Sequence, residues 1–265
     1  MNKLILLIAT IFLISCNMER DADVVLPVYE PELVVECYLI PGEPFRLSVH
    51  ESVSYFEAPH LPEVNDALVT ISYKGTTDTL EYLAFEDPVT RKYFNYFNSK
   101  LVPKDYETEF ILEIKDKKGR VVRGKTKLLP IVKIHSIDFV YNSEGKGYAR
   151  TFFEDDLSTT DYYRYQVTRD TYIGDEMQDF IFTDESLQTS SVEVGGSPRI
   201  FKGDYVIVTL HHLTKEHYDF LLSISYAKDA NGNPFGQPAR IKSNIEGGVG
   251  IFTGLSYDRK ELYAF

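Results

Sequence analysis

The amino-acid sequence predicts a mainly β protein made of two antiparallel β domains and a single helix. The chain of 265 residues contains 19 tyrosines, 17 phenylalanines and no tryptophan, and aromatic and β-branched residues are enriched in strands. Short apolar runs with a period of two recur along the chain and are separated by turn residues, which is typical of antiparallel sheets. One segment changes to helical spacing, so we expect one helix.

The first predicted domain covers residues 32–130. Its stretch ALVTISYKG alternates, so that Val69 and Ile71 share one face of the expected strand. The last two apolar runs are joined across residues 117–119, as in a β-hairpin. Runs at this spacing favour an antiparallel, immunoglobulin-like sandwich. The runs are LVVECYLI, FRLSVHES, ALVTISYKG, DTLEYLAF, KYFNYF, TEFILEIKD and VVRGKTKLL.

The second predicted domain covers residues 131–265 and contains the helix. Its β runs are IHSIDFVYN, GYARTFFED, YYRYQVTRD, MQDFIFTDE, SSVEVG and DYVIVTLHHL. Thr214 is a candidate N-cap, and apolar residues then recur at helical spacing. We therefore expect a helix near 214–228, ended by the turn residues of 229–234. A loop and a final strand, which contains the stretch SNIEGGVGIF, follow the helix.

The first residues, MNKLILLIATIFLISC, form a secretory signal. The apolar stretch from Leu4 to Ile14 is shorter than the ~20 residues of a membrane-spanning helix. The last four residues match the bacterial lipobox, which predicts removal of the signal peptide 1–15 and acylation, including palmitate, of Cys16. An ordinary signal peptide with a coincidental cysteine is the alternative. With residues 16–31 as a lipidated tether, we expect a protein that is anchored to a membrane through lipid and does not span it.

The charge of the chain excludes one class of partner. Its 40 Asp and Glu residues outnumber its 28 Lys and Arg residues, and the formal net charge is −12. Such a surface repels phosphate backbones, so we expect no nucleic-acid binding. Cys37 lies in an apolar run and is expected to be a buried, inert thiol, because lipidation of Cys16 leaves it without a disulfide partner.

The stretch SNIEGGVGIF, residues 243–252, has the glycines of a nucleotide loop but not their spacing. It reads GxGxxxG instead of GxGxxG, and β-like residues, not a helix, follow it. We therefore expect no cofactor there. The glycines are interpreted as structural positions that provide positive φ or close backbone approach: Gly247, Gly248 and Gly250. The following Ile251 and Phe252 are expected to enter the core of the second domain.

Two clusters suggest metal binding, each with a simpler alternative. His211, His212 and His217 lie within seven residues, but neighbouring strand residues point to opposite faces, so we expect hydrogen-bonded histidines and no metal. The acidic stretch 154–156 with Asp161 is a calcium candidate, and a solvated acidic loop is the alternative.

Aromatic strand residues provide the candidate ligand-facing surface. Tyr162, Tyr163 and Tyr165 form the densest patch and could stack on a glycan, although strand tyrosines are more often half-buried sheet residues. No nucleophile elbow or other catalytic arrangement is recognised, so we expect no enzyme. A cell-surface hydrolase is the least favoured alternative.

Several separated stretches resemble one family. They are the lipobox, PELVVE followed by PGEP, VNDALVTISYKG, YYRYQV and, above all, NPFGQPARIKSNIEGGVGIFTG. Together they resemble the domain-of-unknown-function 4249 family of Bacteroidota lipoproteins, over about residues 24–257. The chain departs from the family in having Cys37 where glycine is usual and Val249 where leucine is common.

The resemblance implies a lipoprotein of the outer membrane, commonly encoded beside a TonB-dependent receptor, with an N-terminal sandwich similar to transthyretin-like domains. It implies no catalytic residue. Acidic residues after Cys16 favour export to the cell surface: Glu19, Asp21 and Asp23. Asp78-Thr79-Leu80 matches the short O-glycosylation sequon of that phylum, with Thr79 as the acceptor.

We therefore expect a non-enzymatic accessory subunit of a TonB-dependent receptor, which assists ligand capture or stabilises the complex. The alternative is a stand-alone glycan- or peptide-binding lipoprotein of the cell surface.

Overall fold

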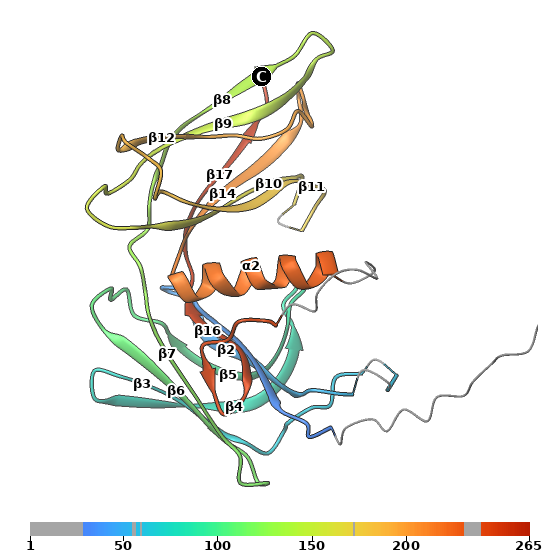
Figure 1. Cartoon of the computed structure of the whole chain (residues 1–265), viewed down its shortest axis with the longest axis vertical. Coiled ribbons are helices and arrows are strands. Elements are labelled where there is room, and N and C mark those ends of the chain that lie inside the picture. Colours follow the sequence, from blue (N-terminus) through green and yellow to red (C-terminus); the bar gives the residue numbers. More distant parts are fainter. Residues whose placement is uncertain (1–28, 55–56, 59, 172, 231–239) are drawn as a thin grey trace, which may run out of the picture. The chain divides into compact units, whose positions relative to one another are not determined.

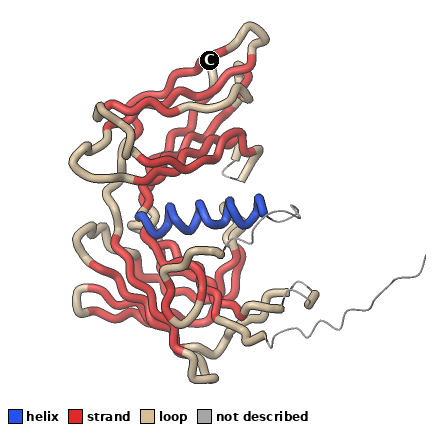
Figure 2. The backbone as a smooth tube through the Cα atoms, in the orientation of Figure 1, coloured by secondary structure: helices blue, strands red, loops and turns tan. Residues whose placement is uncertain are grey.

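A computed structural model of the chain describes residues 29–54, 57–58, 60–171, 173–230 and 240–265. The mainly β fold predicted from the sequence is confirmed: the described strands pair antiparallel, apart from one parallel pair, and are accompanied by one described helix (Figures 1 and 2). The predicted signal peptide, Cys16 and all but the end of the tether lie outside the described residues. No described helix is long and apolar enough to cross a membrane.

The first sheet has nine strands in the order β15-β7-β6-β3-β4-β5-β2-β1-β16. Alternation builds its core: in β1, Leu33, Val35 and Cys37 are fully buried, and the residues between them are not. The bounds are β1 (Leu33–Leu39), β2 (Pro44–Glu51), β3 (Leu68–Tyr73), β4 (Thr76–Glu86), β5 (Tyr93–Leu101), β6 (Glu109–Lys115), β7 (Val121–Lys127), β15 (Ile245–Glu246) and β16 (Val249–Gly254).

The first sheet curls until its two ends meet. Its outermost strands, β15 and β16, are consecutive in the chain, and β16 pairs in parallel with β1. A Cβ atom added to Gly124 of β7 would lie 3.0 Å from the Cβ of Phe252 in β16. Phe252 belongs to the core of this sheet. The expectation that it enters the core of the second domain is wrong, because residues 245–254 return to the first sheet.

The second β region contains the sheet β11-β10-β14-β17 and a group in which β9 pairs with β8, β12 and β13. The bounds are β8 (Ile134–Tyr141), β9 (Lys146–Glu154), β10 (Tyr162–Arg169), β11 (Glu176–Thr183), β12 (Ser191–Val194), β13 (Ile200–Phe201), β14 (Tyr205–Leu213) and β17 (Ser256–Tyr263). Strand β17 was not predicted, because its charged residues conceal the alternation. Its Asp258 is buried and accepts a hydrogen bond from Ile134 N–H at 3.0 Å.

The predicted helix is present as α2 (Lys215–Ala230). Thr214 caps it, because its Oγ1 accepts a hydrogen bond from His217 N–H at 3.2 Å. Figure 1 shows α2 between the first sheet and strands β10 and β14. Two ring contacts fix this position. The ring centroids of His217 and of Tyr38 in β1 are 5.5 Å apart, and those of Tyr218 and of Tyr162 in β10 are 5.0 Å apart.

Candidate functional site

A cavity of about 510 Å³ lies between the first sheet, the second β region and α2. We call it the cleft. Strands β1 and β2, the β4–β5 loop, strands β10, β14 and β17, and the N-terminal half of α2 all contribute described residues to its wall. The cleft is therefore built from segments that are far apart in the sequence.

The described wall of the cleft carries more positive than negative charge. Its carboxylates are Glu43 and Asp87, and its cations are Arg46, Lys92, Arg164 and Arg259. Arg46 forms ion pairs with both wall carboxylates, at 2.6 Å to Glu43 and 2.8 Å to Asp87. A positive cleft on a chain with net charge −12 concentrates anions locally.

Lys92 is the cation best placed to meet a ligand. Its Nζ lies 4.2 Å from the centroid of the Tyr38 ring, and no described carboxylate lies within ion-pair distance of it. Burial lowers the pKa of Lys92, with further lowering from Arg164 and Arg46, which Glu36 opposes. An anion bound in the cleft would favour the charged form of the Lys92 amine and so raise its pKa again. The charged amine would in turn bind the anion more tightly.

Arg164 and Gln166 project from β10 into the cleft and share one acidic partner. The Arg164 guanidinium binds both oxygens of Asp179, and the Gln166 amide nitrogen donates to Asp179 Oδ2 at 3.1 Å. The Gln166 carbonyl oxygen therefore faces His211, whose Nε2 lies 2.8 Å away and must be the donor.

His211 and His217 are neutral and buried in the cleft wall. Burial is the main cause that lowers both pKa values, to about 3 for His217, and the charges of Arg164 and Lys92 contribute. The Nδ1 atoms of both rings lack a partner among the described residues. The cleft thus combines positive charge with ring surface, which also comes from Tyr38 and Tyr257.

The cleft continues along the first sheet. Tyr38 and Lys92 also line a second cavity of about 400 Å³, which His50 and Tyr93 border.

Two of the three tyrosines predicted to face a ligand are buried, and the role of the third, Tyr162, stays a prediction. Tyr163 and Tyr165 have no exposed surface and lie in the second core. Tyr162 is half-buried against Tyr218 of α2. The correction has a simple cause: alternation sends Tyr163 and Tyr165 to the core, and Tyr162 and Arg164 to the opposite face. The same alternation was the signal by which Arg164 and Gln166 could have been found.

The glycine-rich stretch is structural. Gly247 and Gly250 have φ values of +76° and +125°. A Cβ atom on Gly250 would lie 1.9 Å from the carbonyl oxygen of Val35 on the neighbouring strand β1. One on Gly248 would lie 2.6 Å from the carbonyl oxygen of Leu33. These positions let β16 approach β1 closely.

The polar residues before the glycines hold the same turn. Ser243 Oγ accepts a hydrogen bond from Gly250 N–H at 3.0 Å. The Asn244 side chain accepts from Phe252 N–H at 2.9 Å and donates to its carbonyl oxygen at 2.7 Å. The stretch therefore closes the first sheet.

The histidine and aspartate clusters have different outcomes. His211 faces the cleft, whereas His212 contacts Asp161 on the other face of β14, so the two histidines bind different partners. Of the acidic stretch 154–156, the structure brings Asp155 together with Asp161 and with Asp184, which sequence reasoning missed. The other two acidic residues of that stretch are exposed.

The remaining sequence candidates are single residues. Cys37 is fully buried, and burial strongly raises the pKa of its thiol, which makes it unreactive. Thr79 is exposed on β4, and its glycosylation stays a prediction. Cys16, the predicted lipidation site, lies outside the described residues.

The chain thus combines a nine-stranded sheet whose ends meet, a second β region and a cleft lined by more positive than negative charge. Comparison with family models then identifies the family: residues 19–261 match the model described as domain of unknown function (DUF4249), and the chain belongs to this family. The comparison with curated proteins finds no match to the chain.

Proposed function

We propose that this protein is a non-enzymatic, lipid-anchored binding protein of the outer membrane. It captures an anionic ligand in the cleft and serves a TonB-dependent receptor as an accessory subunit. The positive charge of the cleft is the observation that carries the proposal, because Lys92 stands there without an ion-pair partner in the described chain. Clefts lined by one sign of charge raise the local concentration and the association rate of oppositely charged ligands.

The location and the receptor partnership have separate support. The lipobox that ends at Cys16 supports a lipid anchor. The resemblance to lipoproteins commonly encoded beside TonB-dependent receptors supports the partnership. The acidic residues that follow Cys16 support a position on the cell surface.

A second candidate function is a stand-alone binder of acidic glycans or peptides. The rings of Tyr38 and Tyr257 in the cleft favour it, because aromatic faces stack on sugar rings and on peptide side chains. This candidate uses the same cleft and differs only in needing no receptor.

Calorimetric titration tests the cleft, with an oligogalacturonate as acidic glycan, a polyglutamate peptide and citrate as probes. At least one probe should bind, and Lys92→Gln should weaken its binding roughly 10- to 150-fold, since hydrogen bonds to charged groups contribute ~1.5–3 kcal/mol. The matched control is Lys228→Gln, which removes the same charge from the exposed end of α2. Equal affinities for the two variants, or no binding of any probe, would refute capture in the cleft.

Affinity purification from detergent-solubilised outer membranes tests the partnership. A TonB-dependent receptor should be recovered with the tagged lipoprotein under gentle conditions. Recovery of the lipoprotein alone, combined with binding of a probe, would favour the stand-alone function.

A further inference from the structure

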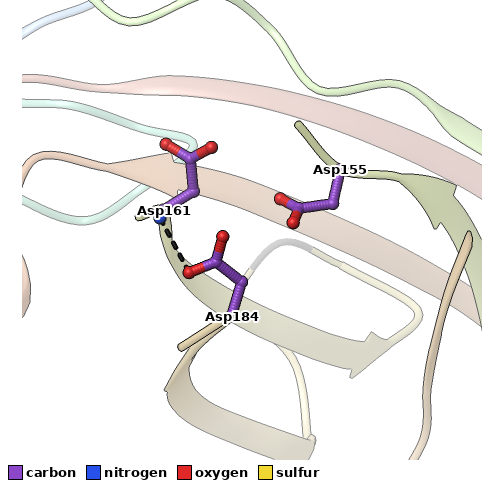
Figure 3. Close-up of side chains that lie close together, drawn as sticks. All are labelled: Asp155, Asp161 and Asp184. Atoms are coloured by element: carbon purple, nitrogen blue, oxygen red, sulfur yellow. Dashed lines mark hydrogen bonds between the residues drawn. The ribbon is translucent and has the colours of Figure 1, made fainter. Parts of the chain in front are cut away.

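Three aspartates meet at one end of the second β region (Figure 3). Asp155 directly follows β9, Asp161 directly precedes β10 and Asp184 directly follows β11. One carboxylate oxygen from each lies within 4.8 Å of those of the other two. The ends of three strands therefore fix the arrangement.

Protein groups contact each of these carboxylates, and for Asp161 they contact both oxygens, because the Thr159 hydroxyl donates to its Oδ2 at 2.8 Å. The Tyr163 hydroxyl donates to Asp155 Oδ1, and Asp161 N–H donates to Asp184 Oδ1 at 2.9 Å. His212 Nε2 lies 3.1 Å from Asp161 Oδ1. These contacts orient the carboxylates, but His212 is the only described base that faces the cluster within ion-pair distance.

One buried oxygen in the cluster lacks a partner. Asp155 is 7% exposed, and its Oδ2 has no hydrogen-bond partner among the described residues. Figure 3 shows its carboxylate directed towards the other two aspartates. A buried acceptor with two carboxylates beside it requires a cation or a proton.

We propose that Asp155, Asp161 and Asp184 bind a calcium ion. Calcium lies 2.3–2.6 Å from its oxygen ligands, so two ligands of one ion are separated by at most about 5 Å, which accommodates the spread of this cluster. Magnesium requires 2.0–2.1 Å and near-ideal octahedral geometry, for which the limit is about 4 Å. Asp161 is half-buried, so water can complete the coordination shell from that side.

The ion joins the ends of β9, β10 and β11 and neutralises charges that otherwise repel one another. Three carboxylates with water as the remaining ligands place the site among weak ones, with a Kd of about 10⁻⁴–10⁻³ M, as in extracellular modules. None of the three aspartates lines the cleft. The calcium proposal can therefore be tested independently of the proposed ligand capture.

Thermal unfolding of the full chain in detergent, after treatment with EDTA, tests the site. Calcium at about ten times its Kd should raise the Tm of the wild type by roughly 3–5 °C. Asp155→Asn should abolish this rise. Without calcium, the variant should unfold at the wild-type temperature or above, because the substitution removes one of three crowded charges and keeps the side-chain shape.

Asp156→Asn is the matched control. This neighbour is exposed and its carboxylate binds Ser158, so the substitution should leave the calcium response unchanged. Calorimetry with calcium chloride should show one binding event in the wild type and none in Asp155→Asn or Asp184→Asn. The assignment is overturned by a wild type that does not respond, by a response that survives Asp155→Asn, or by an equal response to magnesium.

Discussion

Replacing Gly250 by alanine should strongly destabilise the fold. Gly250 has a φ of +125°, which side chains rarely adopt, and residues held in such regions cost about 1–3 kcal/mol. The new Cβ atom would also lie 1.9 Å from the carbonyl oxygen of Val35, so β16 must move away from β1. Overpacking of this kind lowers the free energy of unfolding by about a further 1–3 kcal/mol. The displaced β16 also loses part of its hydrogen bonding to β1. We expect a total cost of roughly 3–6 kcal/mol.

Gly119→Ala separates the two contributions. Gly119 also has a positive φ, of +84°, but a Cβ atom there would meet nothing within 4 Å. This variant should lose only the backbone term, about 1–2 kcal/mol. Urea unfolding followed by circular dichroism gives both values. If Gly250→Ala costs no more than Gly119→Ala, the close approach of β16 to β1 does not exist as described.

Three further predictions concern the cleft and the closing turn. The folded chain keeps His217 and His211 neutral because their pKa values are lowered, whereas the unfolded chain protonates both near pH 6.5. The free energy of unfolding should therefore be highest above pH 6.5. Below that pH it should fall by up to ~1.4 kcal/mol per pH unit for each histidine. Urea unfolding between pH 7.5 and 5 measures the slope, and His217→Gln should reduce it. Asp179→Asn frees the Arg164 guanidinium, so anion affinity measured by calorimetry should rise several-fold, and a fall would contradict the role of positive charge. Asn244→Ala removes two hydrogen bonds to Phe252 and should cost ~1–3 kcal/mol in urea unfolding, with a cost near zero as the contrary result.

Local sequence pattern predicted most of the strands and the helix, because alternation and capping act over a few residues. Thr214 and the period change after it suffice to place α2. The pairing of β16 was not predictable in this way. Alternation shows which residues of a strand are buried, but it does not say which strand lies beside it, and Val35 and Gly250 are separated by most of the chain.

The cleft was missed for a related reason. Residue type suggested the tyrosines of β10, whereas the face of the strand decides which side chains meet a ligand. Arg164 could have been found because it lies between Tyr163 and Tyr165 in the strand and therefore points to the opposite face. The opposite wall, with Tyr38 and Lys92, depends on how two sheets meet around α2, and no local pattern encodes that.

The parallel pairing of β1 with β16 has a consequence for biogenesis. A chain that emerges N-terminus first presents β1 long before β16, and until β16 emerges β1 is an unpaired edge that other chains can join. The first sheet cannot close until the chain is almost complete. A chain truncated before residue 245 should therefore aggregate instead of folding.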